Sequence, residues 1–250
     1  MKNVLLITAT ISPPAGAVNL SRLDPALRLK DYLTAFSFYV NCLDHGYFDR
    51  VVFCENSGSD ISALKEIADN SRNSSKIEFL VFDGVQYPPQ YGRGYGELKL
   101  IDFAMKQSIV IESAPPECLV WKVTGRYIVK NLRNLIPVSG ADFSILYCNC
   151  KNYPTRWVDM YFMGWRVGSY GLIFNGAAER VVESEIIPSA EIGFRGVVDA
   201  LSLENKVNHR FPEPAIVEGI RGFDGAAYEA KFFRYSARKI LGRIAPWFWI

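Results

Sequence analysis

The sequence predicts an α/β domain with a mainly parallel central sheet flanked by helices over residues 1–225, followed by a basic amphipathic helix within 226–250. Short apolar runs alternate with longer segments of helical period, an order typical of parallel strands joined by helices. A chain of 250 residues that is 49% hydrophobic and 22% charged can bury a substantial core. Polar and glycine-rich clusters follow several apolar runs, so we expect the site at the carboxyl ends of the strands.

The first half of the chain is expected to supply the parallel strands. The first strand, Asn3–Thr8, precedes a loop at 9–19 that is rich in proline, glycine and serine. A helix from Pro25 to about His45 follows, because its apolar residues recur at helical spacing. The other elements are strands at Arg50–Cys54 and Lys76–Phe82, a short helix ending near Asn70, a helix over Glu97–Glu112 and a strand at Cys118–Trp121.

Two early strand ends carry polar side chains. Thr8 and Thr10 belong to the first loop, which has the composition of a nucleotide-wrapping loop and equally of a plain surface loop. Glu55 and Asn56 directly follow the second strand, where an acid or an amide can hydrogen-bond a base or a ribose. The same polar segment can instead cap the next helix.

Three glycines, Gly92, Gly94 and Gly96, precede the helix expected from Glu97. A flexible segment at a helix N-terminus suits an anion, because free N–H groups and the helix dipole point toward it. Glu97 either contacts the nucleotide or favours the helix start through the dipole. A glycine-rich lid without a ligand is the alternative.

The segment Lys122–Tyr127 changes character abruptly after the apolar run Cys118–Trp121. Arg126 offers a planar fork that matches phosphate oxygens, Lys122 offers a point charge, and Gly125 lets backbone N–H groups approach closely. These residue types predict an anionic ligand at this strand end.

The second half is expected to continue the same domain without an internal repeat or linker. Its predicted elements are strands at Asp142–Cys150 and Arg156–Phe162, an apolar run at Tyr170–Asn175, helices near Ala177–Glu185 and over Gly193–Asn208, and a short strand at Ala215–Val217.

The order of these segments resembles the bacterial glycosyltransferases of the GT-A fold that assemble O-antigen, capsule and related surface polysaccharides. The resemblance is carried by Thr8-Ala-Thr10, Phe53-Cys-Glu-Asn56, Gly94-Tyr-Gly-Glu97, Lys122-Val-Thr-Gly-Arg-Tyr127 and Pro214-Ala-Ile-Val-Glu-Gly219, spread over residues 1–225. It implies a nucleotide-sugar-binding half at 1–130 and an acceptor half at 131–225. It also implies transfer of a sugar from a nucleoside diphosphate, first of all a UDP-sugar, to a lipid-linked or polysaccharide acceptor.

The resemblance assigns the donor site to the strand ends and the glycine segment. The residues so assigned are Thr8, Thr10, Glu55, Asn56, Gly94, Gly96, Glu97, Lys122, Thr124, Gly125 and Arg126.

One departure from the commoner GT-A pattern concerns the metal. That fold usually places Asp-x-Asp after the fourth strand, where the carboxylates hold a divalent cation, whereas this chain has Thr124-Gly125-Arg126. Two carboxylates recruit a cation, while an arginine can meet the diphosphate itself. We therefore expect metal-independent transfer, in which Arg126 and Lys122 neutralise the leaving group and no cofactor is needed.

An inverting transfer needs a carboxylate that deprotonates the acceptor hydroxyl. Asp159 is the first candidate base because it lies within the aromatic segment 157–165. The alternative is that Asp159 is solvated or paired with an arginine and takes no part in catalysis. Glu204 is the second candidate, with a helix-surface carboxylate as the alternative. Tyr127, His209 and Arg210 are candidate acceptor contacts, and structural roles are the alternative for the last two.

The number and spacing of the cysteines and histidines do not predict a metal site. Five cysteines in a chain without an export signal favour reduced thiols. Cys148 and Cys150 lack the two-residue gap of a zinc knuckle, and His45 and His209 are the two histidines of the chain.

The last segment is basic. Residues 227–250 hold five basic residues and one acidic residue, so they carry +4 and the rest of the chain carries −2. Lys231, Arg234 and Arg238 form a helical stripe beside apolar residues, and Pro246–Ile250 adds aromatics that suit a lipid interface. We expect a cytoplasmic protein that touches the inner membrane surface, with no nucleic acid as partner. A helix packed on the domain is the alternative.

Two other functions remain open on the sequence. A non-catalytic nucleotide-sugar or glycan-binding protein would keep Arg126 and the glycine segment without using Asp159. A sugar nucleotidyltransferase shares the α/β arrangement, but ordinarily needs metal-binding carboxylates near the fourth strand.

Overall fold

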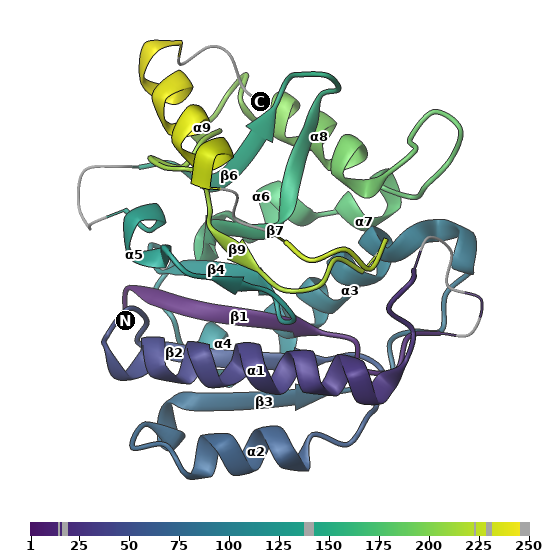
Figure 1. Cartoon of the computed structure of the whole chain (residues 1–250), viewed down its shortest axis with the longest axis vertical. Coiled ribbons are helices and arrows are strands. Elements are labelled where there is room, and N and C mark those ends of the chain that lie inside the picture. The colour runs from purple at the N-terminus through teal and green to yellow at the C-terminus, as the bar shows by residue number, and fades with distance from the viewer. Residues whose placement is uncertain (15, 17–19, 138–142, 223, 229–231, 246–250) are drawn as a thin grey trace.

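The structure is a computed structural model that describes residues 1–14, 16, 20–137, 143–222, 224–228 and 232–245. A seven-stranded sheet runs through the molecule in the order β3-β2-β1-β4-β7-β6-β8 (Figure 1). Its strands are β1 (Asn3–Ala9), β2 (Arg50–Glu55), β3 (Ile77–Val81), β4 (Leu119–Thr124), β6 (Leu146–Lys151), β7 (Trp157–Arg166) and β8 (Val207–Asn208). A separate two-stranded sheet pairs β5 (Ile128–Val129) with β9 (Val217–Glu218).

Strands β1 to β4 are parallel, as the sequence predicts, and the rest of the sheet is mixed. Val4 of β1 pairs with Arg50 of β2 and with Val120 of β4, so the carboxyl ends of these strands meet at one edge. β7 is antiparallel to β4, and β6 is antiparallel to β7. The predicted α/β class with a mainly parallel central sheet is confirmed.

Helices cover both faces of the sheet. Along β1, Leu5 and Ile7 join the core under the first helices, whereas Val4 and Leu6 point to the opposite core, since successive strand residues face opposite sides. The helices are α1 (Pro25–Asp44), α2 (Ser62–Asp69), α3 (Gly92–Gln107), α4 (Ile109–Glu112), α5 (Leu132–Leu135), α6 (Tyr170–Phe174), α7 (Ala177–Arg180), α8 (Ala190–Leu201) and α9 (Phe232–Ile244).

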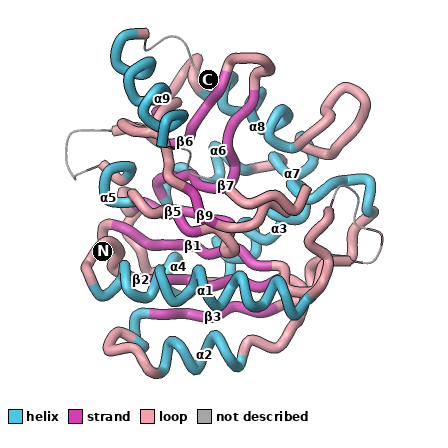
Figure 2. The backbone as a smooth tube through the Cα atoms, viewed as in Figure 1, coloured by secondary structure: helices cyan, strands magenta, loops and turns pink. Residues whose placement is uncertain are grey.

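Figure 2 shows α1 and α2 alongside strands β1 to β3, with β6, β7 and α9 beyond β4. The first helix starts where the sequence places it: Pro25 occupies its first position and the Asp24 side chain accepts from the backbone N–H groups of Ala26 and Leu27. The first half of the chain thus matches its predicted elements closely.

Several predicted elements of the later chain differ. The predicted helix over Gly193–Asn208 spans Ala190–Leu201, and its predicted end is the edge strand β8. The apolar run predicted at Tyr170–Asn175 forms the short helix α6. The predicted strand over Asp142–Cys150 is observed as Leu146–Lys151, with residue 142 outside the described residues.

Two differences bear on the site. The glycines at 92, 94 and 96 form the first turns of α3 instead of a loop before it. Strand β4 also continues through Thr124, so Lys122 lies inside the strand and not at its end.

Candidate active site

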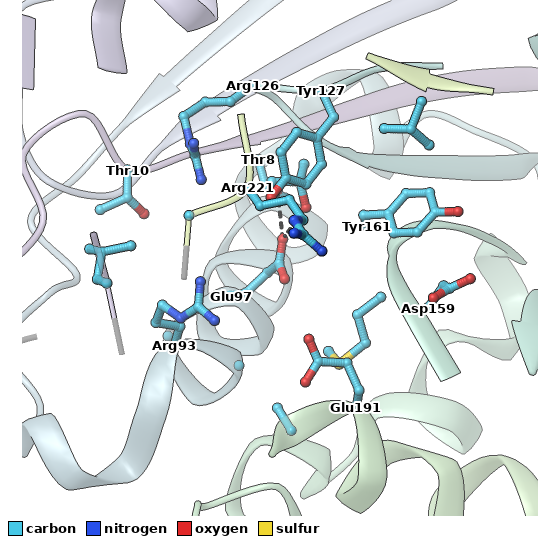
Figure 3. A pocket seen from close by; sticks show the side chains of 18 of the residues that line it. Thr8, Thr10, Arg93, Glu97, Arg126, Tyr127, Asp159, Tyr161, Glu191 and Arg221 are labelled. Carbon is cyan, nitrogen blue, oxygen red and sulfur yellow. Dashed lines mark hydrogen bonds between the residues drawn. The ribbon is translucent and has the colours of Figure 1, made fainter. Parts of the chain in front are cut away.

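A cavity of about 850 Å³ opens at the carboxyl ends of the parallel strands. The end of β1, the segment after β2, the end of β4 and the first turns of α3 form one wall, while β7, the start of α8 and the segments around 214–228 and 235–238 form the other. Figure 3 shows that charged side chains from these separate elements point into the same space.

Arginines dominate the wall at the strand ends. Arg126, directly after β4, is 6% exposed, and its Nη1 donates to the carbonyl of Ile220 at 3.1 Å. Its buried Nε has no hydrogen-bond partner among the residues that the structure describes. A buried donor without a partner is costly, so this atom is suited to a ligand acceptor.

Gly222 shows how close the arginines come to one another. A Cβ placed on Gly222 would lie 2.8 Å from Nη2 of Arg126 and 3.1 Å from Nη1 of Arg93. Arg93 comes from the first turn of α3 and is exposed, so its guanidinium reaches this point from the opposite side of the cavity. Arg221 borders the same cavity and is ion-paired with Asp224 at 2.6 Å.

A buried polar network lies directly behind these arginines. The Glu97 carboxylate accepts hydrogen bonds from Thr8 Oγ1 at 3.1 Å and Thr124 Oγ1 at 3.0 Å, and it is ion-paired with Lys122. Burial alone would raise the pKa of Glu97, but the charge of Lys122 and these hydrogen bonds outweigh it and lower the pKa. Glu97 is therefore ionised at neutral pH.

Lys122 does not line the cavity. Its side chain is fully buried, and its ammonium also donates to the Met160 carbonyl at 2.6 Å and to Thr124 Oγ1 at 3.1 Å. With these acceptors taken, Lys122 lies behind Glu97 and has no open path to a leaving group. The geometry thus separates Lys122 from Arg126, although the two are four residues apart in the sequence.

The loops after β1 and β2 are tied together by Glu55. Its fully buried carboxylate accepts from the backbone N–H groups of Ile11 at 2.9 Å and Ser57 at 3.0 Å. Glu55 does not line the cavity, whereas Thr10 and Asn56 do, joined by a hydrogen bond of 2.6 Å between their side chains. Glu55 thus shapes the loops, and Thr10 and Asn56 face the ligand space.

Three predicted glycines permit close packing at the cavity. A Cβ on Gly94 would lie 1.9 Å from the Ala190 Cβ, and one on Gly96 would lie 2.1 Å from the hydroxyl of Tyr87. Gly125 approaches the end of β1, where its N–H donates to the Thr8 carbonyl at 2.9 Å. Gly94 and Gly96 line the cavity and Gly125 does not.

The opposite wall carries carboxylates. Asp159, on β7, is 6% exposed and lines the cavity. It accepts from Asn149 Nδ2 at 2.6 Å and is ion-paired with Lys151 at 3.4 Å, so the predicted arginine partner is a lysine. Glu191, in the first turn of α8, also lines the cavity, half-exposed. No described residue donates a hydrogen bond to its carboxylate or lies within ion-pair distance of it.

Tyrosines separate the arginines from Asp159. The ring centroids of Tyr127 and Tyr228 are 5.0 Å apart, and Tyr161 lies 6.2 Å from Tyr228. All three line the cavity. Burial raises the pKa of Tyr161 well above its usual value, and its contacts with Asp159 add to that shift. These tyrosines therefore stay protonated and neutral at physiological pH.

Three predicted site residues lie elsewhere. Glu204 is exposed in the turn after α8 and does not line the cavity, because the helix ends at Leu201. His209 and Arg210 are also outside the cavity lining: His209 Nε2 lies 2.7 Å from Ser202 Oγ, and its carbonyl accepts from the N–H of Cys150. Their location corrects the prediction that they approach the substrate.

The C-terminal helix contributes to the cavity. Tyr235 and Arg238 of α9 line it, and Lys239 is ion-paired with Glu213 at 2.5 Å. Residues 229–231 and 246–250, which include Lys231 and the aromatic segment Pro246–Ile250, lie outside the described residues. In the part of the chain that the structure describes, no helix is long and apolar enough to span a bilayer.

The side-chain positions bear on the prediction of metal-independent transfer. Within the described ranges, no three His, Cys, Asp or Glu residues converge in a way that could hold a metal ion. Cys148 and Cys150 are buried free thiols with sulfurs 3.7 Å apart.

No family model and no curated protein matches this chain. Among solved structures it is similar to the galactosyltransferase LgtC in complex with donor and acceptor sugar analogues, at 11% identity over 83% of this chain and 72% of that one, with a TM-score of 0.49. The glycosyltransferase GlyE of Streptococcus pneumoniae matches at 10% identity over 84% and 45%, with a TM-score of 0.46.

A 4-diphosphocytidyl-2C-methyl-D-erythritol synthase matches at 10% identity over 96% of this chain and 98% of that one, with a TM-score of 0.39. At these identities and scores the likeness extends no further than the general α/β arrangement.

Sequence reasoning missed Arg93, Arg221 and Glu191. The two arginines share a signal, since each adjoins a glycine at a cavity wall: Gly92-Arg93-Gly94 and Arg221-Gly222. Glu191 had no such signal, because its importance depends on the helix start at Ala190, three residues before the predicted one.

Proposed function

We propose that this protein is a glycosyltransferase that moves a sugar from a nucleoside diphosphate donor, with a UDP-sugar as first candidate, to a saccharide acceptor. The observation that carries the proposal is the convergence of Arg126 and Arg93, from two separate elements, on one point beside Gly222, with Arg221 lining the same cavity. Guanidinium groups match phosphate oxygens bidentately, and several of them around one point fit a diphosphate.

The arginines would stabilise the charge that develops on the departing diphosphate. Such preorganised donors act most strongly in a site that excludes bulk water, and Arg126 is nearly buried. Because Arg126 stands at the end of β4 and its Nε is unpartnered among the described residues, we infer that it meets the diphosphate directly. This reaction requires no metal ion.

The proton of the acceptor hydroxyl needs a carboxylate with a free oxygen. Asp159 already accepts from Asn149 and is ion-paired with Lys151, whereas Glu191 has no such donor among the described residues. We propose Glu191 as the general base and Asp159 as the group that orients the acceptor. Asp159 as the base is the alternative that the variants described in the Discussion distinguish.

The acceptor is proposed to be a lipid-linked or polysaccharide chain in the assembly of a surface glycan, handled at the inner face of the membrane. Support comes from α9, where Ile240 and Ile244 are 58% and 68% exposed and lie one helical turn apart. Co-sedimentation with anionic liposomes tests the membrane contact. Replacing both isoleucines with serine should reduce the bound fraction, and unchanged binding would contradict it.

The test of the donor site compares nucleoside diphosphates with the matching monophosphates by isothermal titration calorimetry in the presence of chelator. Wild-type protein should bind a diphosphate, UDP first, at least tenfold more tightly than the monophosphate. Arg126→Ala should weaken diphosphate binding by about 10- to 100-fold, the effect of a lost charge-assisted hydrogen bond.

Arg72→Ala is the matched control, because Arg72 is an exposed arginine paired with Asp44 outside the cavity. It should leave the affinity unchanged. Equal affinity for mono- and diphosphates, or binding only after Mn²⁺ addition, would contradict the donor assignment. Turnover of the bound UDP-sugar separates a transferase from a binding protein, which would bind without releasing UDP.

A further inference from the structure

Arg238, on the cavity wall formed by β7, α8 and α9, has no carboxylate partner among the described residues. It lines the cavity from α9 and is exposed, and no carboxylate among the described residues lies within ion-pair distance of it. Two other cations that line the cavity differ: Lys151 is ion-paired with Asp159, and Arg221 with Asp224. Arg238 is therefore available to an anion that enters the cavity.

A latch on Glu213 holds this part of α9 against the domain. The Glu213 carboxylate accepts from the Tyr235 hydroxyl at 2.9 Å and from Lys239 at 2.5 Å, and Asn134 Nδ2 donates to it at 3.1 Å. Tyr235 and Lys239 flank Arg238 in the helix, three residues before it and one residue after it. Two fixed neighbours keep the Arg238 side chain at the cavity mouth.

Arg238 lies on the side of the cavity that holds Asp159. Arg238, Tyr161 and Asp159 all line the cavity. The charge of Arg238 opposes the rise that burial causes in the pKa of Tyr161, which is consistent with this arrangement. Tyr161 in turn contacts Asp159. Trp157, on the same strand, lines the same wall with 38% of its surface exposed. Lys151 Nζ lies over one face of its ring, 4.8 Å from the centroid, and the remaining exposed ring surface is offered to a sugar. The diphosphate is assigned above to a separate site at the strand ends, where Arg126 and Arg93 meet.

We propose that the acceptor is an anionic saccharide, whose phosphate or carboxylate group pairs with Arg238 while its sugar ring lies along Trp157. This inference rests on the proposed function, because it assigns the second wall of the same cavity. It gives α9 a part in acceptor recognition in addition to any contact with a membrane.

The test uses full-length protein saturated with UDP and small sugars as probes. Saturation-transfer NMR titrations with glucose 1-phosphate, glucuronate and neutral glucose should give tighter binding of at least one anionic sugar than of glucose. Arg238→Gln should weaken the binding of that anionic probe about fivefold, because the lost ion pair is partly solvated. Arg238→Lys should restore part of the loss, and Arg72→Gln is the matched control.

The outcomes are distinct. Preference for glucose 1-phosphate identifies a phosphate group and preference for glucuronate a carboxylate. Binding of all three sugars with equal affinity, binding of none, or an anionic probe unaffected by Arg238→Gln would overturn the proposal. Displacement of UDP by the anionic probe would also overturn it, because the probe would then occupy the arginines at the strand ends. If UDP itself did not bind, the proposed donor site would be contradicted. The UDP titration measures this result separately from the sugar titrations.

Discussion

The two walls of the cavity are held in different ways. After the roles proposed above, the wall at the ends of β1, β2 and β4 and the start of α3 is called the donor wall, and the wall formed by β7, α8 and α9 is called the acceptor wall. The donor wall rests on buried groups: Lys122 is fully enclosed against Glu97, and Glu55 binds the backbone of two loops from a fully buried position. The acceptor wall combines a nearly buried pair, Lys151 with Asp159, with the more exposed pair of Lys239 with Glu213 that attaches α9. Buried, fully paired groups fix geometry, whereas solvated pairs contribute little stability and exchange readily. The donor wall is therefore rigid, whereas the part of the acceptor wall that α9 forms can adjust.

The buried side chain of Arg195 also holds part of the acceptor wall firmly. Arg195 of α8 is 3% exposed and donates to the carbonyls of Lys151 at 2.8 Å and Trp157 at 3.4 Å. It thereby fixes both ends of the turn between β6 and β7 to the helix that carries Glu191. Asp159 and Glu191 are thus held relative to each other, while α9 is attached more weakly.

The largest effect is expected at the acceptor wall. Glu191→Gln should lower the rate of sugar transfer by about 10²- to 10⁴-fold, because the acceptor hydroxyl loses its general base. UDP binding should change less than threefold, as the arginines are untouched. Initial rates with a UDP-sugar and calorimetry with UDP measure both quantities.

Asp159→Asn is the companion variant. We expect a smaller loss of rate and a raised KM for the acceptor, because Asp159 already has two partners. If Asp159→Asn abolished transfer and Glu191→Gln did not, the roles of the two carboxylates would have to be exchanged.

The buried pair of the donor wall should show the next effect, on stability. Lys122→Met leaves the Glu97 carboxylate without its cation and should lower the free energy of unfolding by about 3 kcal/mol. This is the lower end of the range for a broken buried pair, because the Glu97 side chain remains 23% exposed. Urea denaturation measures the loss.

The double variant Lys122→Met with Glu97→Gln is the control and should recover much of that stability. A stable Lys122→Met protein with weakened UDP binding would instead restore the original expectation that Lys122 meets the diphosphate.

The next largest effect on stability is expected at the contact between α3 and α8, which joins the two walls. Gly94→Ala places a methyl group 1.9 Å from the Ala190 Cβ, so α3 and α8 must separate. Overpacking of this kind costs about 1–3 kcal/mol. Gly171→Ala is the matched control, because nothing lies within 4 Å of its added Cβ. Thermal unfolding of both variants decides: an unaffected Gly94→Ala protein would show that the halves are not rigidly joined there.

The smallest effect concerns the latch of α9. Hydrogen bonds from Lys239, Tyr235 and Asn134 lower the pKa of Glu213 to about 2, below its unfolded value of about 4.3. A lowered pKa stabilises the folded state above the unfolded pKa, and this contribution is lost as the pH falls from about 4 to about 2. Glu213→Gln should lower Tm by about 1–3 °C at pH 7.

The difference in Tm between wild type and Glu213→Gln should remain constant from pH 7 to about 5 and shrink below about 4. A difference that grows as the pH falls would have the wrong sign and would exclude the latch.

Much of the donor half could be predicted from the sequence, because there each signal is local. Apolar runs such as Val51–Cys54 are long enough to define a buried strand, and Asp24-Pro25 marks a helix start. Parallel strands then bring their carboxyl ends together, which placed Thr8, Asn56 and Arg126 in one region without knowledge of side-chain positions.

The acceptor half depends on long-range packing, and prediction there was weaker. The donor half holds one exception of the same kind: the charge of Lys122 suggested a strand end, yet Glu97 from a distant helix stabilises it inside the strand. Glu204 fell outside the cavity because α8 starts and ends earlier than its apolar pattern indicates. The direction of β7, which decides where Asp159 points, cannot be read from an alternating pattern alone, since strand direction leaves that pattern unchanged.

The position of Gly222 has a consequence for biosynthesis. Its carbonyl accepts from the N–H of Ser21 at 2.8 Å, so an early segment and a late segment of the chain meet beside the arginines. Domains fold during translation from the N-terminal side, and strands β1 to β4 can assemble once about half of the chain has left the ribosome. A nascent chain would thus fold its strand core before the segment around Gly222 completes the cavity.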